Sequence, residues 1–147
     1  MIIAFGSDHA SFELKEYIKA EMIKMGYTIN DLGSDSEKSV DYPDYAIKVA
    51  KEVKAKKAEF GILFCGSGLG MSIAANKVKG IRAALCNDLY LAGMARRHNN
   101  ANILVMGGRV IGKGLAIEIV KIFFNTAFEA GRHQDRLDKI TKIEQEQ

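Results

Sequence analysis

The chain has 147 residues, of which 48% are hydrophobic and 27% charged, and its formal net charge is +3. This length and balance predict one domain, residues 1–147, and exclude disordered, collagen-like and coiled-coil chains. The net charge is too small to demand a nucleic-acid or anionic-membrane partner by itself, so any anion site has to be local.

Short apolar runs alternate with amphipathic stretches along the chain. The runs have the length of strands and cover residues 2–5, 27–29, 60–65, 81–86 and 103–106. The stretches between and after them repeat apolar residues with helical spacing over residues 12–25, 45–57, 71–78, 89–97 and 115–128. Strands without polar alternation are typical of a parallel sheet covered on both faces, so we predict an α/β fold of three layers, an αβα sandwich. A last amphipathic stretch, 132–144, is predicted to be a C-terminal helix outside these layers, where it could serve a dimer interface.

Polar residues and glycines follow the predicted strands. In parallel sheets, ligands collect at the carboxyl ends of the strands, so these residues are the first candidates for a site. They are Asp8 and His9, the segment 65–70, Asn87 and Asp88, and Arg109.

Cys65 opens a glycine-rich segment that ends at Gly70. The three glycines allow a tight turn with outward N–H groups, which suits a phosphate or an oxyanion forming beside a carbonyl. A steric turn beside a buried structural thiol is the alternative. A dinucleotide site is a weaker one, because the spacing is G-x-G-x-G rather than G-x-G-x-x-G. Since a free thiol is only about 3% ionised at pH 7, a basic role for Cys65 requires a nearby cation or hydrogen-bond donor.

Histidines and arginines supply further candidates. Because free histidine titrates near neutrality, His9 and His98 are candidate proton carriers or anion contacts, and ordinary surface histidines are the alternative. Arg132 and Arg136 lie on one face of a predicted helix, either as a phosphate clamp or as solvated charges. Arg109, which follows two glycines, is a candidate of the same kind.

The longest irregular segment covers residues 31–43, and loops of this length are often functional. At its end, Asp41 and Tyr42 bring an acid and an aromatic ring close to a helix start. Asp44 is a candidate cap for that helix.

The cysteines and the N-terminus indicate the compartment. Cys65 and Cys86 match no zinc spacing and no disulfide framework, and we expect Cys86 to be a small core residue. Residues 1–8 reach glycine and aspartate too early for a signal peptide, and no apolar run approaches the about 20 residues of a membrane span. We therefore expect a cytoplasmic protein.

Eight short motifs stand in order along the chain. They are Gly6-Ser-Asp-His-Ala10, Asp41-Tyr-Pro43, Cys65-Gly-Ser-Gly-Leu-Gly70, Ile73-Ala-Ala-Asn-Lys77, Gly80-Ile-Arg-Ala83, Arg97-His-Asn99, Gly107-Gly-Arg109 and Gly131-Arg-His-Gln-Asp-Arg136. Together they closely resemble the type B ribose-5-phosphate isomerases over essentially the whole chain. The resemblance implies a Rossmann-like sheet of five strands and an aldose–ketose isomerase of the pentose phosphate pathway. It also implies interconversion of D-ribose 5-phosphate and D-ribulose 5-phosphate without a metal or organic cofactor.

The resemblance also implies roles for individual residues. Cys65 would be the base that moves a proton between C2 and C1 through an enediolate, and His98 the proton donor that opens the furanose ring. Asp41 and Tyr42 would line the pocket in a supporting role. The remaining positions would contact the sugar, the enediolate or the phosphate, and they are Asp8, His9, Gly66, Ser67, Gly68, Leu69, Gly70, Asn99, Arg109, Arg132 and Arg136. A homodimer or tetramer with pockets shared between subunits is implied as well.

Two positions bear on the branch of the family. Ser11 stands where the family commonly has glycine, and we expect it to cap the following helix. Ala74 and Ala75 offer no carboxylate to replace Cys65 as the base, which favours the cysteine branch. Isomerisation of galactose or allose 6-phosphate and non-catalytic binding of a sugar phosphate are the alternative functions.

Overall fold

The computed structural model describes all of residues 1–147 and contains one parallel sheet. Its strands are β1 (Ile2–Ser7), β2 (Thr28–Asp31), β3 (Phe60–Cys65), β4 (Ala83–Leu85) and β5 (Ile103–Gly107). They are hydrogen-bonded in the order β2-β1-β3-β5-β4, and every pair is parallel. The predicted α/β class with five parallel strands is confirmed.

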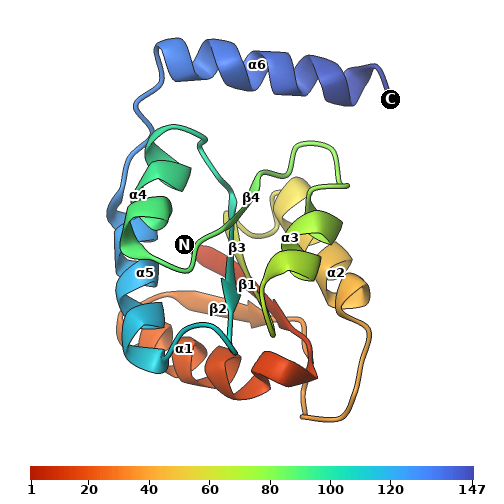
Figure 1. The fold of residues 1–147 in the computed structure, drawn as a ribbon, viewed down its shortest axis with the longest axis vertical. Coiled ribbons are helices and arrows are strands. Elements are labelled where there is room, and N and C mark those ends of the chain that lie inside the picture. The colour runs from red at the N-terminus through yellow and green to blue at the C-terminus, as the bar shows by residue number, and fades with distance from the viewer.

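Helices cover both faces of the sheet (Figure 1). They are the single turn η1 (His9–Ser11) and the helices α1 (Phe12–Lys24), α2 (Tyr42–Lys54), α3 (Leu69–Ala75), α4 (Leu89–Arg97), α5 (Lys113–Asn125) and α6 (Arg132–Gln145). Helices α1, α4 and α5 pack with one face of the sheet, and α2 and α3 with the other. The central strands β1, β3 and β5 lack polar alternation because both of their faces are buried: Phe5 and Phe64 pack toward α1, whereas Leu63 and Val105 pack toward α2.

Helix α6 lies outside these layers, across the end of the sheet where β4 and β5 begin (Figure 1). Near its start, the N–H of Glu129 donates to the carbonyl of Arg97 at 3.1 Å. Near its end, the Glu144 carboxylate accepts from the N–H of Gly80 at 3.0 Å. The predicted C-terminal helix is thus confirmed. None of the helices is long and apolar enough to cross a lipid bilayer.

The two expected helix caps have different outcomes. Helix α2 begins at Tyr42, so Asp41 holds the cap position and the expected Asp44 lies in the first turn, because residue type alone does not determine where a helix starts. Ser11 holds the expected N-cap position of α1, but its side chain makes no cap hydrogen bond, and its buried hydroxyl has no partner.

Candidate active site

A cavity of about 460 Å³ opens at the carboxyl ends of β1, β3 and β5. It collects side chains and backbone from four segments far apart in the sequence. Its lining is Asp8, His9, Ala10, Tyr42, Cys65, Gly66, Ser67, Gly70, Arg109 and Val110. The expectation that polar strand ends share one edge of the sheet is confirmed for the segments after β1, β3 and β5.

Cys65 ends β3 and is 5% exposed. Its Sγ accepts a hydrogen bond from the N–H of Gly68 at 3.1 Å, an interaction that stabilises negative charge on sulfur. The N–H groups of Gly66, Ser67 and Gly70 donate to no other atom of the chain. A thiol therefore stands beside unused backbone donors, which is the arrangement that an enolate-type intermediate requires.

Glycine is required at two positions of this loop. Gly68 has a φ of +84°, which side chains rarely adopt, and a Cβ there would also collide with Leu85. At Gly70, a Cβ would lie 2.6 Å from the ring of Tyr42. The absence of a side chain lets the Tyr42 ring pack on the loop and form one wall of the cavity.

Asp8 and His9 follow β1 and are held by backbone amides. The Asp8 carboxylate, 8% exposed, accepts from the N–H of Ala10 at 3.0 Å. The Nδ1 of His9 accepts from the N–H of Val40 at 3.2 Å. The proton of neutral His9 therefore sits on Nε2, which leaves Nε2–H as a donor. No sequence signal marked Val40, because this contact joins residues 31 apart through an irregular segment.

Arg109 lies against the glycine loop. Its backbone N–H donates to the carbonyl of Gly66 at 2.9 Å, and its guanidinium packs beside Gly66. No acidic side chain pairs with Arg109, so its charge is free to meet an anion. Val110, which is 58% exposed at the rim, was missed by the sequence analysis.

Cys86 has the predicted core position. It is 1% exposed and belongs to the apolar cluster between the sheet and helices α1, α4 and α5. Burial, together with the nearby Asp88 carboxylate, raises the pKa of this thiol to about 12. Cys86 is therefore protonated at neutral pH.

The other predicted site residues lie at the opposite edge of the sheet. His98 and Asn99 follow α4, which runs from the carboxyl end of β4 back to the start of β5. Arg132 and Arg136 lie on α6, exposed and without an acidic partner. A strand of five residues is about 16 Å long, so these groups cannot reach Cys65 within one chain.

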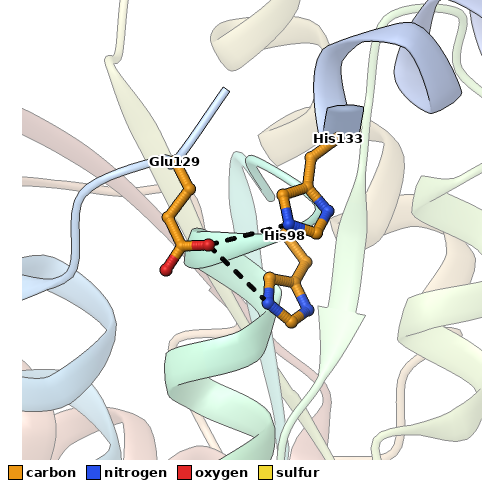
Figure 2. Close-up of side chains that lie close together, drawn as sticks. All are labelled: His98, Glu129 and His133. Atoms are coloured by element: carbon orange, nitrogen blue, oxygen red, sulfur yellow. Dashed lines mark ion pairs between the residues drawn. The ribbon is translucent and has the colours of Figure 1, made fainter. Parts of the chain in front are cut away.

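At that edge, two histidine rings are stacked (Figure 2). The rings of His98 and His133 have centroids 4.2 Å apart and planes 12° apart. Glu129 Oε2 lies 3.6 Å from His133 Nε2 and 4.0 Å from His98 Nε2. Its other oxygen, Oε1, lies 3.1 Å from Nε of Arg97.

These three side chains also form the only group of three or more potential metal ligands whose ligand atoms all lie within 4.8 Å of one another. A nitrogen lone pair lies in the plane of its imidazole ring, and two nearly parallel rings cannot aim their lone pairs at one ion. Positive charge from Arg132 and Arg136 further opposes a cation. The cluster is therefore poorly arranged for a metal.

The fold and the thiol cavity together define an α/β enzyme with a candidate acid–base site. Residues 3–140 match the family model described as Ribose/Galactose Isomerase. The chain therefore belongs to the ribose/galactose isomerase family, and the resemblance seen in the sequence is confirmed.

Individual relatives agree over nearly the full length. Ribose-5-phosphate isomerase B of Escherichia coli is 47% identical over 143 residues, covering 97% of this chain and 96% of the relative. The structure of ribose-5-phosphate isomerase B from Clostridium thermocellum superposes with a TM-score of 0.99 at 49% identity, covering 99% of each chain. D-erythrulose-4-phosphate isomerase of Pectobacterium atrosepticum is 42% identical over 146 residues, covering 99% of this chain and 96% of the relative.

Proposed function

We propose that the protein interconverts D-ribose 5-phosphate and D-ribulose 5-phosphate, with Cys65 as the base and His98 as the acid that opens the sugar ring. The observation that carries the proposal is the position of Cys65 in a cavity beside the unused N–H groups of Gly66, Ser67 and Gly70. The family membership and the names of the relatives support the substrate class.

Ring opening comes first because ribose 5-phosphate is mainly a furanose. Protonated His98 donates a proton to the ring oxygen O4, and the C1–O4 bond breaks. The C1 hydroxyl proton leaves to a base or to water, and the electron pair of that O–H bond forms the C1 carbonyl. Neutral His98 then recovers its proton from solvent.

Isomerisation follows at the glycine loop. Deprotonated Cys65 removes the proton from C2, and the electrons pass to O1 to give an enediolate. The backbone donors beside Cys65 are placed to stabilise this charge. The O2 proton passes to O1, and the electron pair of the O2–H bond forms the C2 carbonyl. The π electrons of the enediolate take the proton back from Cys65 at C1, so C1 becomes an alcohol carbon, C2 a ketone and Cys65 a thiolate again. Aldose and ketose have the same atoms and oxidation balance, and no redox partner takes part.

We assign the phosphate to arginines and His9. Arg109 lies in the cavity with an unpaired guanidinium, and His9 offers Nε2–H there. Arg132 and Arg136 are unpaired on α6 and suit the same anion, since guanidinium groups bind phosphate bidentately. Asp8, Asn99 and Tyr42 are proposed to contact or enclose the sugar, with Asp41, Gly68 and Leu69 shaping the surrounding backbone.

The two groups of residues meet only if two chains combine. Each chain carries the thiol cavity at one edge of the sheet and His98 with the α6 arginines at the other. A homodimer, alone or within a tetramer, in which the α6 edge of one subunit closes the Cys65 cavity of its partner completes the site. Exposed apolar side chains stand near both edges, such as Leu69 and Val110 beside the cavity and Ile143 on α6. The unpaired thiols of Cys65 and Cys86 fit the reducing cytoplasm.

The deciding experiment is an isomerisation assay with a chelator present, on ribose 5-phosphate, for wild type, Cys65→Ala and Cys86→Ala. Removal of the base should lower kcat by about 10²- to 10⁴-fold with a small change in KM, because a base acts in the transition state. Cys86→Ala, which removes the core thiol, should keep wild-type kinetics. Equal turnover by Cys65→Ala and wild type would refute the assignment of the base.

A sugar phosphate of another length remains a candidate substrate, because the family description and the names of the relatives mention different sugars. The family description includes galactose, and one relative is a D-erythrulose-4-phosphate isomerase. Comparing kcat/KM on four-, five- and six-carbon sugar phosphates separates the classes, although one carbon in pocket length changes this ratio only about 10- to 200-fold. A preference for a tetrose or hexose phosphate would replace the pentose assignment. Binding without turnover of any sugar phosphate would indicate a non-catalytic binder.

A further inference from the structure

We infer that His133, through its stacked ring, is a positioning residue that holds the imidazole of His98 for ring opening. This inference rests on the proposed function, since it takes His98 as the acid. Figure 2 shows the two rings face to face, with Glu129 beside their edges.

His98 is poorly held by its own element. It follows the last turn of α4, and its side chain is 38% exposed. A side chain at a helix end can change rotamer freely, yet a proton donor must keep its nitrogen within hydrogen-bond reach of the reacting oxygen. His98 therefore requires a support from outside α4.

His133 supplies that support from a second element. It lies in the first turn of α6, and its side chain is only 8% exposed. Its backbone N–H donates to the carbonyl of Ala130 at 3.1 Å. The ring of His133 covers one face of the His98 ring at 4.2 Å. A buried ring of fixed orientation leaves the stacked partner few rotamers.

Glu129 ties the two elements together at this point. Its backbone N–H donates to the carbonyl of Arg97, and its carboxylate lies beside Nε of Arg97. The same carboxylate faces Nε2 of both histidines. A single acidic residue thus fixes the start of α6 against the end of α4, and with them the two rings.

The charges around the two histidines favour a neutral His133, so the stacked rings do not repel each other. Burial lowers the pKa of His133, and the positive charges of His98, Arg132 and Arg136 lower it further against the opposing effect of Glu129. His133 is therefore neutral at pH 7, so it does not repel a protonated His98. Arg97 is the remaining charged group at the cluster, and Glu129 pairs with it.

The test separates ring opening from proton transfer. Ribulose 5-phosphate is open-chain because its O5 carries the phosphate, so exchange of its C1 hydrogen in D₂O needs Cys65 and the enediolate but no ring opening. Turnover of ribose 5-phosphate needs both steps. Each variant is measured by both assays.

His133→Ala should lower kcat on ribose 5-phosphate at least about tenfold and leave C1 exchange within about twofold of wild type. His133→Phe, which keeps a planar ring without nitrogens, should restore most of the turnover. Glu129→Gln should reduce turnover in the same selective way, whereas Glu118→Gln should not. Glu118 is the matched control, an exposed carboxylate paired only with Lys121.

Several outcomes overturn the inference. If His133→Phe loses as much turnover of ribose 5-phosphate as His133→Ala, a ring nitrogen matters rather than the stacked ring. Parallel loss of turnover and exchange would indicate a general structural role, and unchanged turnover in His133→Ala would exclude any role. His98→Asn is the reference: if it opens ribose 5-phosphate as wild type does, the proposed acid is wrong. If only His98→Asn is impaired, the proposed function stands and the inference fails.

Discussion

Two buried cysteines at comparable depth differ in what surrounds each sulfur. Sγ of Cys65 meets the N–H of Gly68 at the edge of a cavity. Cys86 is enclosed by apolar side chains and lies near the Asp88 carboxylate, so its neutral form is strongly favoured. The sequence predicted this difference because glycines follow only one of the two cysteines.

The raised pKa of Cys86 predicts an alkaline loss of stability. The folded thiol ionises near pH 12 and an unfolded one near 8.5, so between these values the unfolded chain binds fewer protons. The Cys86 contribution is therefore fully present below about pH 8.5 and declines as pH rises toward 12. From pH 8 to pH 10 the stability advantage of wild type over Cys86→Ala should shrink by about 2 kcal/mol. Urea unfolding at both pH values measures this, and a constant difference would contradict it.

At the scale of elements, a buried ion pair joins α1 to the edge strand β2. The Lys15 side chain is 1% exposed, and its Nζ lies 2.7 Å and 2.8 Å from the two carboxylate oxygens of Asp31. Lys19 also reaches Asp31, at 2.6 Å. Burial alone would raise the pKa of Asp31, but these hydrogen bonds and one from Gly33 N–H hold it below its usual value. The carboxylate is thus ionised and holds the outer strand.

Removing the carboxylate should cost more stability than removing the lysine. Asp31→Ala leaves the Lys15 ammonium buried with only Glu16 nearby, and we expect a loss of about 2–3 kcal/mol. Lys15→Met replaces the charge by an apolar chain while Lys19 still pairs with Asp31, so the expected loss is below about 1 kcal/mol. Urea unfolding measures both. Glu21→Ala, which breaks the exposed pair with Lys24, is the control and should change the free energy of unfolding far less than Asp31→Ala.

The elements themselves were largely predictable, but their boundaries were not. Apolar runs located the central strands because a doubly covered sheet leaves few polar positions there. At the partly exposed edge strand β2, the run 27–29 missed the polar residues Asn30 and Asp31. Helices α2, α3 and α5 begin two or three residues before the predicted ranges, since a first helical turn, such as 42–44, carries no apolar repeat. The run 81–86 overestimated β4, because Ile81 and Cys86 are buried without belonging to the strand.

At the scale of the whole molecule, the candidate site is divided between the two edges of the sheet. Strand ends predicted the Cys65 half, because residues that directly follow strands share the carboxyl edge. No spacing in the sequence predicts where α6 packs, so the distance between Cys65 and His98 was not foreseeable from the residues alone. The pairing of His133 with His98 and Glu129 was missed for the same reason, since it depends on how α6 meets α4.

The divided site predicts complementation between two inactive variants. If Cys65 of one chain works with His98 of another, a mixed dimer of Cys65→Ala and His98→Asn has one pocket with both groups intact. Random mixing during refolding should then restore about a quarter of wild-type activity, because half of the dimers are mixed and half of their pockets are complete. Each variant refolded alone is the control. A mixture no more active than the two variants alone would place both groups within one subunit.

In such a dimer the central strands separate the two active centres. Each chain contributes the carboxyl edge of its sheet to one pocket and the amino edge to the other, so the length of β3 and β5 sets the spacing of the two active centres. One added residue in a central strand would shift α6 by about 3.3 Å relative to the cavity and reverse the faces of the residues beyond it. In that arrangement both active centres, as well as packing, would constrain the length of the central strands.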